Sequence, residues 1–349
     1  MKTNKYLPDI SIIRPICIFL LIVYHSFIIY QGGWEMPLDF KPIAAYWWIG
    51  KISYAFMLEL FVFISGYVFA LSLQKRELSF GQLLNSKLKR LILPSIVFSV
   101  GYYFMFLYTG EFHILHFLQT ILSGAGHMWF LPMLFWVTLL CYIIDRVKCI
   151  PNWVKTIGIG GLPILSVLPI PFQINIALYY ALFFCLGMLI FRKRAYIKSH
   201  FCNKPRLAIL WGGVFCITFI GGALFIRDIL NFYVQNDSLI IKGTSLIIQK
   251  YVMIIYALSG ITCVYLLTNY YILSKNINLP SYVIELNSIC FGIYLFQQFI
   301  LKILYYNTNL PSIVGPYWLP WLGVFITLLL SIGLTIVSRQ SRIGRYILG

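Results

Sequence analysis

Long apolar segments alternate with short polar ones along the whole chain, and the polar segments hold most of the charged residues. Each apolar segment is close to the roughly 20 residues that a helix needs to cross a bilayer. The pattern therefore predicts an all-α, polytopic integral membrane protein with about ten transmembrane helices. The fifth expected span is the weakest, because it contains the sequence IGIGGLP. The expected spans are residues 9–30, 47–72, 88–109, 129–145, 153–169, 175–191, 207–226, 248–270, 287–305 and 317–338.

Composition agrees with a membrane protein. Of the 349 residues, 60% are hydrophobic and only 11% are charged, whereas soluble domains average about a quarter charged residues. The net charge of +17 does not indicate a nucleic-acid partner, because the basic residues lie in short loops between apolar segments. We expect one transmembrane domain over residues 1–349, no separate soluble domain, and an uncleaved first span.

The distribution of lysine and arginine predicts the orientation. An even number of spans puts both termini on one side of the membrane, and 20 of the 27 basic residues fall on that side, Lys2 and Lys5 among them. Cytoplasmic loops are enriched in Lys and Arg, so both termini are expected in the cytoplasm. The eight cysteines fall within spans or cytoplasmic loops, and no disulfide is expected there.

Arg14 and His25 are ionisable residues within the first apolar span. Eleven helical residues advance the chain by about 16 Å and end about 20° from the starting face, so the two side chains are expected on one face. The histidine is a candidate general base. The alternatives are that Arg14 snorkels to the headgroups and that His25 makes only a helix–helix hydrogen bond. Pro15 leaves open whether a kink separates the two.

Other ionisable groups have several possible roles. Glu59 lies mid-span, either as a structural partner of Arg14 or His25 or as part of the site. Lys302, near the outer end of its span, is expected to snorkel. His113, His116 and His127 occupy or flank the loop after the third span, but their spacing is a weak signal for zinc. No metal site is therefore expected.

Several segments together resemble the membrane-bound acyltransferase 3 family. The first span resembles its signature of an arginine, ten residues and a histidine, followed by a small polar residue. The matches occur in family order between residues 9 and 298. Two positions depart from the family pattern. The basic pair is usually two arginines three residues apart, but here it is Lys87 and Arg90. The late segment often ends in histidine, but here it has Gln297. The matching segments are DISIIRPICIFLLIVYHS, FVFISGYVF, KLKRLILP, GHMWFLPMLFW and FGIYLFQQ.

The resemblance implies transfer of an acyl group, most often acetyl, to a hydroxyl of a glycan or lipid-linked sugar in a bacterial cytoplasmic (inner) membrane. The implied donor is cytoplasmic acyl-coenzyme A (acyl-CoA), a substrate rather than a bound cofactor. His25 is the candidate catalytic residue, as a base or as a transient acyl carrier, and Arg14 is expected to bind donor oxygens or to orient the site.

Further residues have tentative roles. Lys87 and Arg90 are candidates for binding the donor phosphates, although ordinary positive-inside charge explains them equally well. His127 is a possible lining residue of the acceptor entrance, and Trp129 is that or an interface anchor. Ser65 and Gly66 are expected to allow close helix packing.

The main rival hypothesis is a transporter or flippase for a glycan intermediate, which would also have many spans and intramembrane charges. Succinyl or a longer acyl chain is an alternative to acetyl. The acceptor, the membrane face of transfer and the oligomeric state stay open.

Overall fold

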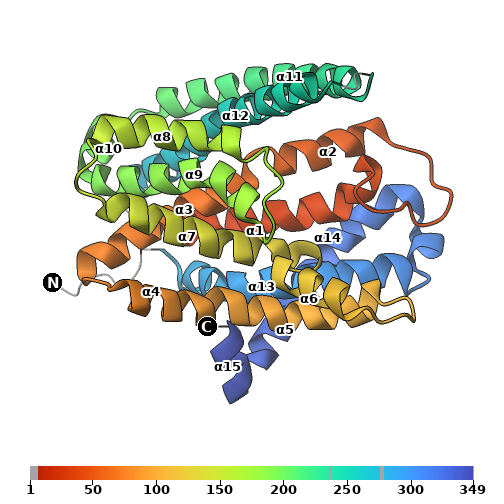
Figure 1. The fold of residues 1–349 in the computed structure, drawn as a ribbon. Coiled ribbons are helices and arrows are strands. Elements are labelled where there is room, and N and C mark those ends of the chain that lie inside the picture. The colour runs from red at the N-terminus through yellow and green to blue at the C-terminus, as the bar shows by residue number, and fades with distance from the viewer. Residues whose placement is uncertain (1–6, 236–237, 276–278, 349) are drawn as a thin grey trace. The chain divides into compact units, whose positions relative to one another are not determined.

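The computed structural model of the protein describes residues 7–235, 238–275 and 279–348. This part of the chain is helical, without any strand (Figure 1). Nine of its helical segments are long and apolar enough to cross a membrane, so the predicted all-α, multi-span class is confirmed. Lys2 and Lys5 lie outside the described residues. The nine segments are Pro8–Gln31, Ala44–Lys75, Phe80–Leu107, Gly126–Arg146, Ile174–Arg192, Pro205–Leu230, Leu239–Leu273, Ser281–Tyr306 and Leu310–Ser338.

The span expected at residues 153–169 forms a shorter helix, α8 (Asn152–Leu165). Its 14 residues rise about 21 Å, which is less than the roughly 30 Å of a bilayer's hydrocarbon core. It ends where Pro163 and the following turn interrupt the helical hydrogen bonds. The tenth crossing therefore stays a prediction.

The chain divides into two compact units. Unit 1 comprises Met1–Leu58, Cys202–Ala208 and Gly260–Gly349, and unit 2 comprises Glu59–Phe201 and Ile209–Ser259. Each unit is described by itself. Three of the four boundaries fall inside helices, namely α3 (Met57–Lys75), α11 (Pro205–Gln235) and α12 (Leu239–Lys275).

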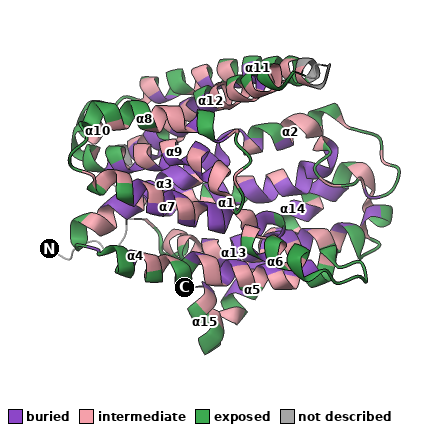
Figure 2. Cartoon of the chain, viewed as in Figure 1, coloured by how far each residue is buried: buried purple, intermediate pink, exposed green. Residues whose placement is uncertain are grey.

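In unit 1, helix α1 packs against three other helices of that unit and buries most of its length (Figure 2). Proline fits the first turn of a helix because its missing N–H has no partner there, and Pro8 begins α1. The helix runs on through Pro15, so Arg14 and His25 lie on one continuous helix. The elements of this unit are α1 (Pro8–Phe27), a 3₁₀ turn (Ile28–Gln31), α2 (Ala44–Tyr54), α13 (Ser281–Tyr306), α14 (Leu310–Ser338) and α15 (Arg342–Leu348).

In unit 2, helices α3 and α9 (Ile174–Arg192) approach each other closely through two glycines. A Cβ on Gly66 would overlap the carbonyl of Phe184, and a Cβ on Gly187 would overlap the carbonyl of Phe63. The expected close packing at Gly66 is therefore confirmed, since only a residue without a side chain fits there. The other helices that lie wholly in this unit are α4 (Phe80–Lys87), α5 (Leu93–Tyr102), α6 (Ile114–Ser123), α7 (Phe130–Arg146), α8 and α10 (Arg194–His200).

The third span begins earlier than the predicted residue 88. Ser79 and Gln82 form a capping box that starts α4, and such a reciprocal pair satisfies two N–H groups at a helix start. A π-helical turn, Leu88–Ile92, joins α4 to α5, with the Leu93 N–H bonded to the Leu88 carbonyl. Pro94 explains this turn, because a proline cannot donate to the carbonyl four residues earlier.

Candidate active site

His25 lies in the interior of unit 1 and is hydrogen-bonded to a side chain of α13. Its Nδ1 lies 3.0 Å from Oε1 of Gln297. Only 6% of His25 and 0% of Gln297 is exposed. Both residues lie within segments long and apolar enough to cross the membrane. The imidazole is therefore held in a fixed place by a neutral amide, away from bulk solvent.

Arg14 makes a second bond between the same two helices. Its Nη1 donates to Oδ1 of Asn287 at 3.0 Å, so both side chains of α1 reach α13. The expectation that Arg14 and His25 share a face is thereby confirmed, and Pro15 does not separate them. Since the earlier residue of α1 pairs with the earlier residue of α13, the two helices run in the same direction. This direction agrees with the ten-span expectation, in which α13 is the ninth crossing.

Aromatic and basic side chains surround the His25 end of this face. The indole of Trp34 is nearly parallel to the His25 ring, at 3°, with the ring centroids 6.0 Å apart. The ammonium of Lys302 lies 5.5 Å from the centroid of the Trp34 ring, so Lys302 makes a cation–π contact within unit 1. Tyr305 donates to the carbonyl of Ser26, next to the histidine, at 2.8 Å. Together these contacts fix the loop after α1 beside the candidate base.

Unit 2 contains a separate buried cluster around Glu59. The carboxylate is 3% exposed, and its Oε1 accepts a hydrogen bond from the Tyr179 hydroxyl at 3.1 Å. The Lys250 ammonium lies 4.9 Å from the centroid of the Tyr179 ring and attracts the carboxylate electrostatically. Glu59 thus has partners on α9 and α12 within its own unit.

The basic pair Lys87 and Arg90 lies at the junction of α4 and α5, in unit 2. Arg90 is exposed and Lys87 is half-buried, with its ammonium 5.5 Å from the centroid of the Phe69 ring. The π-helical turn contains Arg90 and directly follows Lys87. Turns of this kind are frequent at functional sites. The two cations are therefore close in the chain but differ in their surroundings.

His127 and Trp129 lie on a 3₁₀ turn, Gly126–Trp129, that leads into α7 in unit 2. His127 is buried, at 4% exposed, with its ring centroid 6.3 Å from that of Tyr102. Trp129 is half-buried and lies 6.5 Å from Tyr180, centroid to centroid. The roles predicted for these two residues stay predictions.

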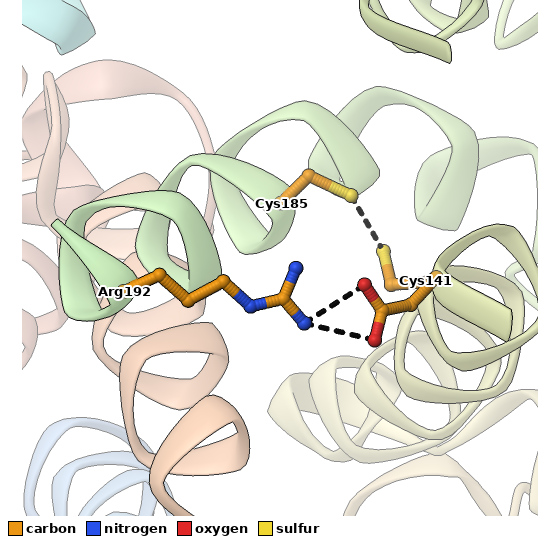
Figure 3. A network of polar contacts seen from close by, with 4 residues as sticks. Cys141, Cys185 and Arg192 are labelled. Atoms are coloured by element: carbon orange, nitrogen blue, oxygen red, sulfur yellow. Dashed lines mark hydrogen bonds and ion pairs between the residues drawn. The ribbon is translucent and has the colours of Figure 1, made fainter. Parts of the chain in front are cut away.

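A polar contact between α7 and α9 lies where both helices end (Figure 3). Arg192 Nη2 donates to both carboxylate oxygens of Asp145 at 2.8 Å. About one turn earlier on α7, the sulfurs of Cys141 and Cys185 lie 3.3 Å apart. All eight cysteines, which fall within the described residues, have free thiols. This contact joins two helices of unit 2 and contains no predicted site residue.

No group of three or more His, Cys, Asp or Glu side chains in the described ranges could hold a metal ion.

Sequence reasoning did not identify Asn287, Trp34, Tyr179 or Lys250 as neighbours of candidate residues. The signal for these neighbours in the sequence is weak. Asn287 and Gln297 are two amides ten residues apart in the expected span 287–305, and Lys250 is a lysine within the expected span 248–270.

The comparisons with known proteins identify a family. The acyltransferase 3 family, described as an acyltransferase domain, has a model that matches residues 7–339 of this chain. The chain belongs to the acyltransferase 3 family. Comparison with curated proteins and with solved structures found no match. The match covers all of the candidate site residues named from the sequence, so the predicted family resemblance is confirmed.

Proposed function

We propose that the chain is a membrane O-acyltransferase. It moves an acyl group, with acetyl as the first candidate, from cytoplasmic acyl-CoA to a hydroxyl of a cell-surface polysaccharide or lipid-linked sugar. The proposed location is the bacterial inner membrane. Family membership supports acyl transfer, and the many apolar helices support a multi-pass membrane protein.

One observation supports the assignment of the site more than any other, namely the hydrogen bond between His25 and Gln297. A hydroxyl attacks a thioester slowly until a base removes its proton. Imidazole is suited to this task, because its ordinary pKa lies near neutral pH. In this protein it lies inside a membrane span, where a polar group is costly and usually functional.

The proposed reaction balances without any further reactant. The basic nitrogen of His25 removes the proton of the acceptor hydroxyl as the hydroxyl oxygen attacks the thioester carbonyl carbon. A C–O bond forms, the C–S bond breaks, and the coenzyme A thiolate leaves with the electron pair and receives the proton from the imidazolium. In the alternative route, the acyl group is first transferred covalently to the His25 imidazole, and the acceptor hydroxyl then attacks this acyl-histidine.

Cationic side chains have roles in donor recognition in this proposal. Arg14 lies on the same helix face as His25 but three helical turns away, bonded to Asn287, so its proposed role is to bind a donor phosphate or to orient that end of the site. Lys87 and Arg90 attract the coenzyme A phosphates. A lysine at the first position keeps the charge of an arginine but not its two-pronged donor geometry.

The test is to express His25→Ala and Arg14→Ala at matched membrane levels in a strain lacking the native protein. Transfer of label from acyl-CoA to the glycan fraction is then measured. We expect the His25 variant to lose about a hundredfold or more of the activity. His113→Ala is the matched control, because this loop histidine has a side chain that is 75% exposed.

Full transfer by the His25 variant would contradict the assignment of the base. Absence of any acyl-CoA-dependent labelling by the native protein would contradict the acyltransferase proposal itself, and is the result expected of a flippase. Parallel reactions with acetyl-CoA and succinyl-CoA identify the donor. Mass spectrometry of surface glycans from the deletion strain identifies the acceptor.

A further inference from the structure

The hydrogen bond at Nδ1 of His25 constrains where the imidazole proton lies. A neutral imidazole has one N–H and one basic nitrogen, and the partner of one nitrogen determines which is which. The atom facing Nδ1 is a carbonyl-type oxygen, Oε1 of Gln297, which can only accept. With this acceptor beside it, Nδ1 would carry the proton of the neutral ring, and Nε2 would be the basic nitrogen.

Packing alone gives no reason for a glutamine at this position. Gln297 is 0% exposed, and its Nε2 has no hydrogen-bond partner among the described residues. Leaving a buried polar group unsatisfied costs about 1–3 kcal/mol. An apolar residue of similar volume would avoid this cost but would leave Nδ1 of the buried His25 without its acceptor. The amide therefore leaves its own nitrogen unpaired while its oxygen pairs with the histidine, which points to a role for that oxygen.

The helices around this pair are well placed to keep its geometry. Arg14 and Asn287 make a second polar bond between α1 and α13, three helical turns away. The hydroxyl of Tyr305, also on α13, bonds to the carbonyl of Ser26 at 2.8 Å. With bonds on either side of the pair along the helix axis, α13 cannot slide along α1 without breaking at least one of them.

We propose that Gln297 is a positioning residue that holds His25 in the Nδ1–H tautomer and directs its Nε2 toward the acceptor hydroxyl. This inference rests on the proposed function and deepens it. Gln297 acts through the histidine, by making the nitrogen opposite to the hydrogen bond the base.

The test compares two replacements of Gln297 in the full-length protein in membranes. Gln297→Met keeps the length of the side chain and removes the accepting oxygen. Gln297→Glu keeps an accepting oxygen at the same length. We expect kcat to fall about a hundredfold in the Met variant, with KM for acyl-CoA and for the acceptor unchanged. The Glu variant is expected to stay within about tenfold of the native kcat.

A matched control separates this role from a general loss of a buried amide. Asn269 is also in unit 1 and 0% exposed, and its Nδ2 donates to the carbonyl of Tyr265 on the same helix at 2.9 Å. Asn269→Leu removes a buried amide without removing the partner of His25, and is expected to leave kcat unchanged. Membrane yield and thermal stability in detergent are recorded for every variant. If Gln297→Met is not recovered folded, Gln297→Leu replaces it.

The outcomes distinguish this inference from the proposed function. Native kcat in the folded Met variant would overturn the positioning role, as would equal losses in the Met and Glu variants. A raised KM with native kcat would also overturn it, since that is the result of lost substrate binding. If His25→Ala is inactive while Gln297→Met is fully active, only the positioning role fails. If His25→Ala is active, the proposed base itself fails.

Discussion

The two units of the molecule each hold a polar group at membrane depth, and they stabilise it differently. In unit 1, His25 is bonded to a neutral amide, Gln297. In unit 2, the carboxylate of Glu59 is bonded to Tyr179, with the ammonium of Lys250 nearby. The first arrangement involves no opposite charge in its hydrogen bond, whereas the second combines a carboxylate with a cation.

This difference suggests different tasks. An imidazole bonded to an amide can gain and lose a proton without breaking an ion pair. The Glu59 carboxyl group is held in its own cluster by the Tyr179 hydroxyl and by electrostatic attraction to Lys250, and removal of either partner leaves it less well solvated. Unit 1 is therefore suited to proton transfer, and the Glu59 cluster is suited to joining the helices of unit 2.

The largest expected effect tests the structural role of the unit 2 cluster. Lys250→Met removes the nearby ammonium that attracts the buried Glu59 carboxyl group, whose Oε2 already has no hydrogen-bond partner among the described residues, and leaving a buried polar group less satisfied costs about 1–3 kcal/mol. We expect a lower yield of folded protein and a lower unfolding temperature in detergent. The double variant Glu59→Leu/Lys250→Met removes both charges and is expected to recover much of the loss.

The contrary result is also informative. If Glu59→Gln is recovered at native yield but transfers no acyl group, the carboxylate takes part in the chemistry and the contrast between the units fails. Tyr179→Phe is the companion variant, because it removes only the hydrogen bond to Oε1 and keeps the ring that faces Lys250.

An intermediate effect is expected at the other end of the α1 face. Arg14→Gln keeps a donor for Asn287 but removes the positive charge proposed to attract a donor phosphate, and we expect transfer to fall about tenfold with the folded yield retained. Asn287→Leu keeps the charge and loses only the orienting bond, so its loss should be smaller. Equal losses in the two variants would show that orientation, and not charge, is what Arg14 contributes.

The smallest expected effect concerns the ion pair between Asp145 and Arg192. Both side chains are partly exposed, and such surface pairs contribute about 0–1 kcal/mol. Asp145→Asn should therefore change neither the yield nor the rate measurably, although Nη2 of Arg192 reaches both carboxylate oxygens. A loss of folded protein as large as that of the Lys250 variant would show that stabilisation of unit 2 depends on its α7–α9 contact as much as on Glu59.

The repeated apolar segments were sufficient to predict the helical class and most of the spans. A segment that crosses a bilayer must pair its own backbone N–H and C=O groups in hydrogen bonds, and it must be apolar for about 20 residues. The exception was the segment at 153–169, where glycines and a proline shorten the helix to Asn152–Leu165. Helix α4 was missed because its capping box, Ser79 and Gln82, lies in polar sequence before the apolar run.

The candidate base and its arginine could also be predicted, since helical periodicity alone puts residues eleven apart on one face. Their partners could not be. Asn287 and Gln297 are about 270 residues away in the chain, and no local pattern states which helix packs against α1. For the same reason Glu59 could be recognised as buried and functional or structural, but not assigned to Tyr179 and Lys250.

The sequence by itself determined that this protein is a bundle of membrane helices of the acyltransferase 3 family, with His25 and Arg14 on one helix face. These properties depend on hydrophobic length, helical period and short motifs, which are local. Only the tertiary structure decided that a neutral amide bonds to the histidine while a carboxylate and an ammonium are neighbours in unit 2. Those pairings depend on which helices meet and at which register, and that is set by packing over the whole chain.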